Sequence, residues 1–343
     1  MDGKFLTGGA RVILVGDIGG TKTRVAAIAR DLARDSMVVE TYRSAEHAGF
    51  LEILQLFMER HRPEVEACCV GVAGPVQDNR CSATNLPWVV DGRDLARHLG
   101  IASASLLNDL EAVAYGIEVL QPDEIAELQA GEPGVQGNRA VIAAGTGLGE
   151  AGLFWDGAAH RPFGSEGGHA DFAPGDELEI DLLRALLLEY ERVSWERLVS
   201  GPGLENILRF LRSSERFDRV AESPAVLTEL DKAGEGGQAA LVSKYAASGE
   251  SPLCALALDR FVKLYGAEAG NLALKMKATG GLYVGGGIAP KNLAKMQDGT
   301  FLAAFLAKGR MRPLLEKMPV RILLNDQTAL LGTANCALRS AGS

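Results

Sequence analysis

The sequence lacks the segments that would anchor the chain in a membrane or export it. No apolar run reaches the length of about 18 residues that a membrane-spanning helix requires. Met1–Ala10 carries one lysine and no apolar core, which does not fit a signal peptide, and we expect a disordered leader there. These absences predict a cytoplasmic protein without a membrane partner.

Patterns that bind zinc or form disulfides are missing as well. The five cysteines are an odd number, and no two of them stand in Cys-x-x-Cys spacing. The five histidines are scattered and form no His/Cys cluster at zinc spacing. The sequence therefore predicts reduced, buried thiols, as is typical of the cytoplasm.

Positive charge is in short supply. The chain has 35 Lys and Arg against 44 Asp and Glu, a net charge of −9, which argues against a nucleic-acid or anionic-membrane surface. Hydrophobic residues make up 47% of the 343 residues, so the chain is globular and long enough for two domains with cores of their own.

Glycine is abundant and gathers in turns. Gly16–Thr21 separates the apolar runs Arg11–Val15 and Val25–Ile28, a pattern that predicts two strands joined by a turn whose exposed N–H groups suit a phosphate. No Gly-Lys-Ser/Thr follows and a strand replaces the helix, which excludes a P-loop and a dinucleotide fingerprint. Gly145–Gly149 repeats the pattern. Taken alone, such a turn fits a plain glycine hairpin better than a phosphate site.

Hydrophobic periodicity predicts a mixed α/β chain in two halves. In the first half we expect strands at 11–17, 23–30, 36–43, 66–72 and 103–107 and helices at 48–62, 91–99 and 110–120, with Asp91 as an N-cap. Residues 122–138 form the passage between the halves, with a short helix at 123–129 as an open alternative. In the second half we expect a hairpin at 139–155, strands at 280–284 and 320–324, and helices at 176–191, 194–212, 223–231, 237–246, 252–277, 301–307, 312–317 and 327–338.

An ordered set of short motifs covers nearly the whole chain. It consists of Gly16–Arg24, Gly71–Pro75, Thr84–Trp88, Leu107–Leu110, Gly145–Gly149, Ser165–His169, Val199–Gly203 and Gly285–Gly287. In this order the set resembles the bacterial ATP-dependent glucokinases that lack a zinc motif, within the actin-like and hexokinase superfamily. The individual motifs are weak, but their ordered set is specific.

The resemblance implies a fold, a domain plan and an activity. The fold is α/β, a two-domain actin-like ATPase (ribonuclease-H-like) fold with a cleft between the lobes. Residues 1–120 plus 327–343 form a small α/β domain and residues 121–326 a large one. The implied reaction transfers phosphate from ATP, with Mg²⁺, to the 6-hydroxyl of D-glucose, giving glucose 6-phosphate and ADP at the first step of glycolysis. A homodimer and a hinge that closes the lobes on the sugar are implied too.

Asp109 is the first candidate for catalysis. A carboxylate between a strand and a helix can accept the proton of an attacking hydroxyl, which is the main chemical demand of phosphoryl transfer. From the local sequence alone, Asp109 fits an N-cap of the following helix better. Asn108 and Asn85 are candidates for holding sugar hydroxyls, and either fits an Asx-turn as well.

A second group of polar residues suits a polyol. Glu166 and His169 stand three residues apart with glycines between them, and a carboxylate and an imidazole can together bind several hydroxyls. A turn with solvated ends and a metal pair are the alternatives. The resemblance adds Glu196 as a third sugar-binding acid, although by itself it fits a first-turn helix acid after a Ser cap.

The resemblance also assigns the nucleotide side. The residues that it places at ATP are Gly16, Asp17, Ile18, Gly19, Gly20, Thr21, Gly145, Thr146, Gly147, Gly201, Gly285, Gly286 and Gly287. Asp17 faces Mg²⁺ in this scheme, through water. Three positions depart from the family: Lys22, which we expect to be a solvated turn cation, Thr23, where the family often has Ala, and Glu150, which we expect to point away from the phosphate.

Two other functions stay open. A kinase for another hexose or an amino sugar differs from a glucokinase by only a few hydrogen bonds. A sugar-sensing regulator on a kinase scaffold is disfavoured, because such proteins add a basic helix-turn-helix and only about ten residues precede the first strand here.

Overall fold

The computed structural model describes residues 11–217, 220–234 and 236–341 of the chain, and the leader expected over residues 1–10 lies outside them. The chain forms two compact units. Unit 1 contains the described residues up to Glu124 together with those from Asn325 onward, and unit 2 is Ile125–Leu324. None of the helices over the described residues combines the length and apolar character needed to cross a bilayer.

Unit 1 is built on a five-stranded sheet of order β3-β2-β1-β4-β8. Its strands are β1 (Arg11–Ile18), β2 (Lys22–Ile28), β3 (Val38–Arg43), β4 (Glu64–Val72) and β8 (Ala104–Asn108). The first three strands form an antiparallel meander, while β4 and β8 run parallel to β1. The strands end within one or two residues of the expected positions, and the apolar runs that predict β1 and β4 are buried segments.

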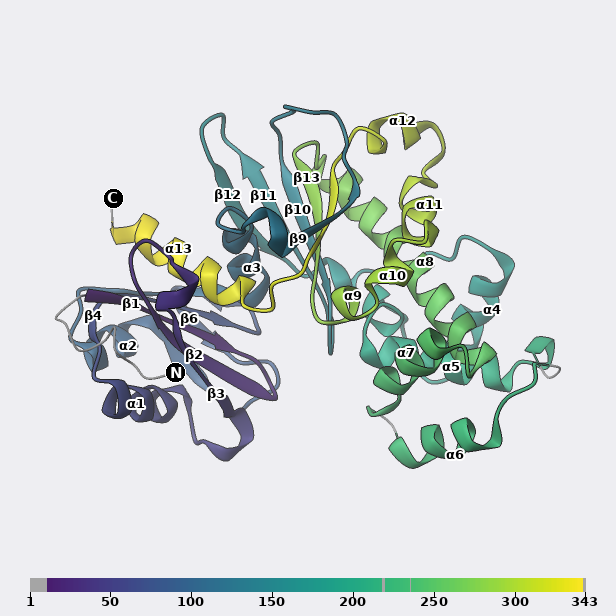
Figure 1. Ribbon diagram of the computed structural model, residues 1–343, viewed down its shortest axis with the longest axis horizontal. Helices are drawn as coiled ribbons and strands as arrows, with labels where there is room; N and C mark the ends of the chain where they lie inside the picture. Colours follow the sequence, from purple (N-terminus) through teal and green to yellow (C-terminus); the bar gives the residue numbers. More distant parts are fainter. Residues whose placement is uncertain (1–10, 218–219, 235, 342–343) are drawn as a thin grey trace. The chain divides into compact units, whose positions relative to one another are not determined.

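Helices cover both faces of this sheet. They are α1 (Phe50–His61), α2 (Gly92–Leu99), α3 (Asp109–Ile117) and α13 (Thr328–Ala341). Alternate residues of β1 face opposite sides, so that Leu14 packs with Phe50 of α1, and Ile13 packs with Leu330 of α13. Figure 1 shows α1 and α13 on opposite sides of the sheet. The expected cap of α2 is confirmed, because Asp91 Oδ1 accepts a hydrogen bond from the Arg93 N–H (2.9 Å).

Unit 2 repeats the strand order of unit 1. Its sheet runs β12-β11-β10-β13-β14-β9, again an antiparallel meander followed by two strands parallel to its first strand, with a sixth strand, β9, antiparallel at the edge. The strands are β9 (Ile125–Gln129), β10 (Arg139–Ala144), β11 (Leu148–Trp155), β12 (His160–Ser165), β13 (Gly281–Gly285) and β14 (Val320–Leu323). The alternative of a helix over 123–129 is wrong, since β9 pairs with β14 and only Pro122–Glu124 makes a 3₁₀ turn.

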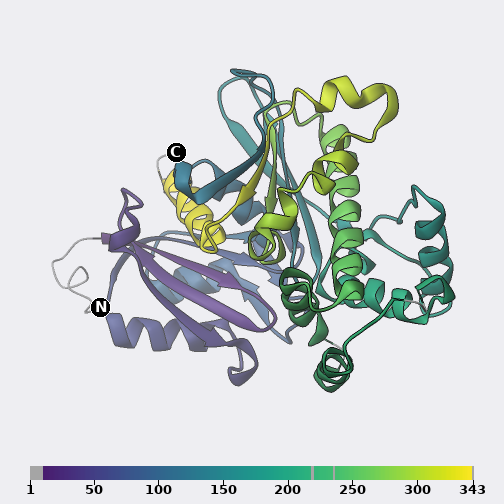
Figure 2. The same cartoon turned by 45° about the vertical axis from the view of Figure 1, so that its right-hand side comes forward.

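Nine α-helices complete the described part of unit 2. They are α4 (Glu177–Leu186), α5 (Gly201–Ser213), α6 (Pro224–Ala233), α7 (Gln238–Ser248), α8 (Pro252–Met276), α9 (Ile288–Lys291), α10 (Leu293–Met296), α11 (Thr300–Leu306) and α12 (Arg312–Leu315). The helix α8 runs beside the sheet (Figure 2) and packs into one core with β10 and β13. The single helix expected over 194–212 is wrong: a 3₁₀ turn (Trp195–Arg197) precedes α5, because Ser200 interrupts it as the N-cap of α5.

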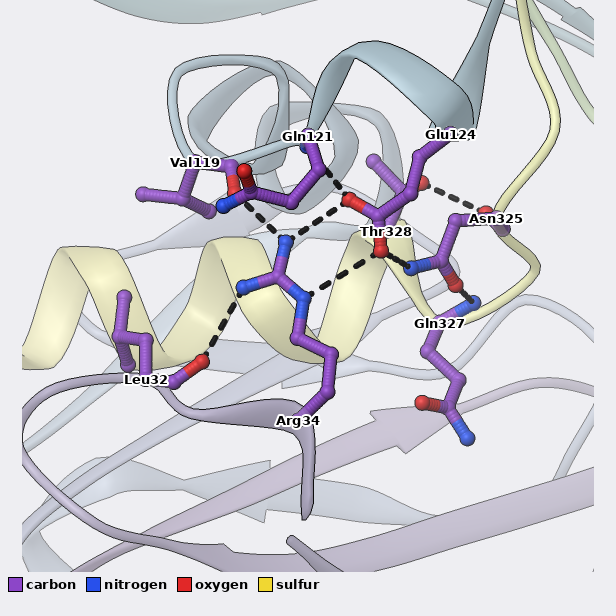
Figure 3. A network of polar contacts seen from close by, with 8 residues as sticks. All are labelled: Leu32, Arg34, Val119, Gln121, Glu124, Asn325, Gln327 and Thr328. Atoms are coloured by element: carbon purple, nitrogen blue, oxygen red, sulfur yellow. Dashed lines mark hydrogen bonds and ion pairs between the residues drawn. The ribbon is translucent and has the colours of Figure 1, made fainter. Parts of the chain in front are cut away.

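Two features of unit 1, a small sheet and a polar network, were not predicted from the sequence. A small sheet of β5 (Val76–Gln77), β6 (Arg80–Ser82) and β7 (Val89–Asp91) follows β4. A polar network joins the residues before and after unit 2 (Figure 3). In it, Arg34 Nη2 donates to Glu124 Oε2 (2.8 Å) and to the Val119 carbonyl oxygen (2.6 Å), and Asn325 Nδ2 donates to Glu124 Oε1 (2.6 Å). Burial raises the pKa of Glu124, but these hydrogen bonds outweigh it and lower the pKa.

Candidate functional site

The first glycine-rich turn is closed by backbone bonds and braced by a serine. The Gly19 N–H donates to the Lys22 carbonyl oxygen (3.0 Å). Ser44, just after β3, donates its N–H to the Thr21 carbonyl oxygen (3.1 Å) and its hydroxyl to the Gly19 carbonyl oxygen (2.8 Å). Thr21 and Lys22 are exposed, as a solvated turn requires. Sequence reasoning missed Ser44, because nothing in a lone serine marks a contact made through the tertiary fold.

Asp17 lies at the end of β1, directly before this turn. It is half-buried and stands opposite Arg24 in the β1–β2 register. Burial raises the pKa of Asp17, and the charge of Arg24 opposes the shift. Arg24 itself binds Asp326, with its Nη2 2.9 Å from the carboxylate oxygen. A cation near Asp17 would offset the cost of burying its charge.

Asn108 and Asp109 lie at the carboxyl edge of the same sheet. Ile18 is in register with Val72, and Val72 with Asn108, so these strand ends form one row at the edge where α/β sites form. At the usual strand spacing, two strands set Asn108 about 10 Å from Ile18. The expected hydroxyl ligand Asn108 and the expected nucleotide ligand Ile18 therefore belong to one edge of unit 1.

The N-cap of α3, which the local sequence assigns to Asp109, is Asn108, and Asp109 Oδ1 shares the Leu110 N–H at 3.0 Å. Asn108 Oδ1 accepts from the Leu110 N–H (2.9 Å), and Glu111 Oε2 accepts from the Asn108 N–H (3.1 Å), which together form a capping box. Asp109 is the first residue of α3, where the helix dipole favours a negative charge. The Asn-x-x-Glu spacing is a known cap signature and could have located this cap.

Asn85 lies beside the first turn. A Cβ atom on Gly20 would stand only 2.9 Å from the Asn85 Cβ, so the two backbones approach closely because Gly20 has no side chain. The Asn85 side chain is exposed. Trp88, three residues on, is buried in the core of unit 1.

Unit 2 brings its three glycine groups together around the second turn. The Gly145 N–H donates to the Gly147 carbonyl oxygen, and the Gly201 N–H donates to the Gly145 carbonyl oxygen, each at 2.8 Å. Gly286 follows β13 with φ +78°, and a Cβ there would collide with the Ala144 backbone. Gly287 and Thr146 are exposed, and Gly285 is buried at the end of β13. The turns expected to hold ATP in unit 2 are therefore neighbours.

Glu166, His169 and Glu196 meet in unit 2, although Glu196 lies on a separate segment of the chain. His169 Nε2 is 3.9 Å from Glu166 Oε2, and His169 Nδ1 is 3.8 Å from Glu196 Oε1. These atoms are too far apart to bond one another, yet one hydroxyl group can reach both members of a pair. The arrangement suits a ligand with several hydroxyls.

Glu196 also ties this cluster to the second turn. Its Oε2 accepts a hydrogen bond from the Leu148 N–H (3.0 Å), while Oε1 faces His169. Ser200 donates its hydroxyl to the Glu196 carbonyl oxygen (2.7 Å) and accepts from the Gly203 N–H (3.0 Å). Glu196 lies in the 3₁₀ turn after Ser194, and no side-chain cap bond from Ser194 accompanies it. One carboxylate oxygen is thus fixed and the other is directed toward the cluster.

Two units of one strand order, each opening on a glycine-rich hairpin, define an actin-like ATPase fold of the sugar-kinase kind. A glucokinase from an Antarctic psychrotroph has the same fold, with a TM-score of 0.78, 29% identity and coverage of 96% of this chain and 99% of that one. A ROK family glucokinase from Streptomyces griseus, solved with glucose and AMPPNP, shares the fold at a TM-score of 0.67 and 21% identity, over 96% of this chain and 99% of that one.

Sequence comparison identifies the family. The model of the Glucokinase family matches residues 14–340. A glucokinase of Nostoc sp. strain PCC 7120 is 43% identical over 341 residues, which cover 96% of this chain and 99% of the relative. The chain belongs to the glucokinase family, and the resemblance found in its motifs is confirmed.

Proposed function

We propose that this chain transfers the γ-phosphate of ATP to the 6-hydroxyl of D-glucose, giving glucose 6-phosphate and ADP, and that Asp109 accepts the hydroxyl proton. One observation carries the role of Asp109. It occupies the first turn of α3 at the carboxyl edge of the sheet, and Asn108 and Glu111 supply the cap. The capping box is complete without Asp109, whose Oδ1 also accepts from the Leu110 N–H (3.0 Å), and the place of Asp109 at this sheet edge supports a part in proton transfer.

Two groups of side chains bind sugar hydroxyls in this proposal, one within each unit. Asn85 and Asn108 bind hydroxyls from unit 1, and Glu166, His169 and Glu196 bind them from unit 2. The support from unit 2 is the spacing of the last three side chains, which lets one hydroxyl beside a pair reach both of its members. The two compact units would then be the small and large domains of the enzyme.

ATP is held mainly by backbone in this proposal. Gly16–Thr21 and Gly145–Gly147 offer N–H groups to the phosphates, and Gly201 and Gly285–Gly287 leave room for the adenosine. The close packing of Gly145, Gly201 and Gly286 supports a common role.

Asp17 is the residue that we propose for Mg²⁺. Among the described residues, no three His, Cys, Asp or Glu side chains gather as a metal site. One half-buried carboxylate beside a phosphate-binding turn nevertheless fits Mg²⁺, which keeps several waters and takes its other ligands from phosphates. When bound, the ion would neutralise charge on the phosphates. Asp17 would orient it through water.

We further propose a cytoplasmic homodimer without nucleic-acid or membrane partners. The five free, buried cysteines support a reducing compartment. The net charge of −9 argues against a surface that binds a polyanion such as nucleic acid. Light scattering coupled to gel filtration measures the oligomeric state directly, and a monomeric mass would contradict the dimer.

A panel of sugars tests the substrate. Initial rates of ADP formation are measured with glucose, mannose, fructose and N-acetylglucosamine under the same conditions. We expect glucose to give the highest kcat/KM, because the family model and the relatives that this chain matches are those of glucokinases. A higher kcat/KM for another member would transfer the proposal to that sugar, and no activity with any of them would refute the kinase assignment.

A further inference from the structure

The second glycine-rich turn leads directly into a buried acid. Glu150 lies on β11, only 1% exposed, and its Oε1 has no hydrogen-bond partner among the described residues. An ionised carboxylate in this position would lose most of its hydration without compensation, so burial favours the protonated form. The expectation that Glu150 points away from the phosphate stays a prediction, but its burial shows that water does not solvate it.

Glu150 has a second acid beside it. The carboxyl of Glu268 on α8 is fully buried, and its charge acts on the Glu150 carboxyl. Glu268 has cationic and amide partners of its own: its Oε2 accepts from Asn271 Nδ2 (2.8 Å), and Lys275 Nζ stands 3.3 Å from its Oε1. Glu150 has no such partner for its Oε1 among the residues that the structure describes, so Glu150 is the member of the pair suited to keep the proton.

The other charged and titratable groups near the pair come from two segments. Lys275 and Tyr265 lie with Glu268 on α8, and Lys308 follows α11. Lys308 donates to the Ala267 carbonyl oxygen (2.8 Å), and burial lowers its pKa. Burial and the charge of Glu268 raise the pKa of Glu150 to about 8, and the charge of Lys275 opposes this shift.

Glu150 packs against the turn that carries the sugar-binding cluster. In the β11–β12 register it stands opposite Ser165, the residue before Glu166. A Cβ on Gly167 would overlap Glu150 Oε2, and a Cβ on Gly168 would overlap the Leu148 carbonyl oxygen. The two glycines between Glu166 and His169 thus pack directly against β11, and Gly167 packs against the Glu150 carboxyl.

We propose that Glu150 is a positioning residue for sugar binding: its protonated carboxyl, packed against Gly167, seats the Gly167–Gly168 turn on β11, and its ionisation unseats that turn. The proposal rests on the proposed function, because it concerns how Glu166 and His169 are held for the sugar. A negative charge on Glu150 would lie beside that of Glu268 in the interior, where like charges repel strongly. The structure can relieve this repulsion by moving the carboxyl toward the turn, or by admitting water there.

The KM for glucose should therefore depend on pH. If only the protonated form binds sugar, the apparent KM scales inversely with its fraction, which falls from about nine-tenths to about one-tenth between pH 7 and pH 9. We expect the wild-type KM for glucose to rise about tenfold over this range, with a much smaller change in the KM for ATP.

The test compares the wild type with Glu150→Gln, a neutral isostere of the protonated acid. Both KM values and kcat are measured from pH 6.5 to 9.5, with ADP formation followed directly. We expect the variant to bind glucose at pH 7 as the wild type does and to lose the alkaline rise. A flat wild-type profile, or an alkaline rise that persists unchanged in Glu150→Gln, overturns the proposal.

Thermal unfolding separates this proposal from the proposed function. A group whose pKa is raised by folding stabilises the fold less as pH rises from its unfolded value through its folded value. The thermal unfolding midpoint of Glu150→Gln should therefore rise relative to that of the wild type as the pH increases from 6 to 9, whether or not glucose is a substrate. A difference that stays constant with pH overturns the role of Glu150, whereas a complete lack of glucose phosphorylation at pH 7 counts only against the proposed function.

Discussion

Replacing Asp109 with Asn should separate chemistry from folding more cleanly than any other change in unit 1. The amide has nearly the same shape but cannot accept a proton from the sugar. A general base contributes a factor of about 10²–10⁴, so we expect kcat to fall by that factor. The KM for glucose should change little, because an amide can still hydrogen-bond a hydroxyl.

The structure sets a low limit on the cost in stability. The cap of α3 is made by Asn108 and Glu111, both of which stay in place. Only the favourable interaction of a charge with the helix N-terminus is lost, about 0.3–1 kcal/mol. In a unit of this size that corresponds to a shift in the thermal midpoint of at most about 4 °C.

Glu111→Gln is the matched control. It removes one carboxylate from the same helix turn, and its amide oxygen can still accept from the Asn108 N–H, which lies 3.1 Å from Glu111 Oε2. We expect its kcat to stay within about twofold of wild type, since it removes no group that reacts. Pre-steady-state measurement of ADP formation isolates the chemical step. If Asp109→Asn kept more than about a tenth of wild-type kcat, Asp109 would not be the base.

Three further predictions concern the sugar-binding acids, the glycine after β13 and the residue proposed for Mg²⁺. Glu166→Gln and Glu196→Gln should each lower kcat/KM for glucose by about 10- to 100-fold, because each variant loses a charge-assisted hydrogen bond of about 1.5–3 kcal/mol. Only Glu196→Gln should also raise the KM for ATP, because Glu196 accepts a hydrogen bond from the backbone after the second turn. A change confined to the KM for ATP in both variants would contradict the sugar role. Gly286→Ala should destabilise unit 2 by about 2 kcal/mol or more, since a side chain there is strained at φ +78° and collides with backbone atoms. Gly287→Ala, with nothing within 4 Å of its Cβ, should unfold in urea as the wild type does. Equal urea midpoints for the two variants would refute this reasoning. Asp17→Asn should raise the Mg²⁺ concentration for half-maximal rate about 10- to 100-fold, as the loss of an outer-shell ligand does, and an unchanged Mg²⁺ titration would count against that role.

Local pattern predicted those parts of the fold that depend on neighbours in sequence. Both glycine-rich hairpins are confirmed, because a turn between two short apolar runs leaves few other structures open. β12 was not predicted, since Pro162 and Gly164 break the strand pattern and its place is set by pairing with β11. β9 is an edge strand with little apolar character, and only its pairing with β14 defines it.

The candidate site divides in the same way. The motifs located the residues, but none of them could show that His169 stands between Glu166 and Glu196, since Glu196 reaches this position through the fold. The interaction of Glu150 with Glu268 is equally hidden, because it joins a strand to a distant helix. An acid at an apolar strand position was the one local sign that Glu150 has an unusual environment.

The place of α13 in unit 1 has a consequence for how the chain folds during synthesis. One face of the first sheet, which includes Ile13 and Val15, is covered by Leu330 and Leu331 of α13. These residues are made only after all of Ile125–Leu324. Until then, the strands that emerge first have one apolar face that α13 does not yet cover. Unit 2 is continuous in sequence and can complete its core earlier. In a growing chain the second unit therefore matures before the first, the reverse of the usual order, and the early strands are the part that most needs protection from aggregation.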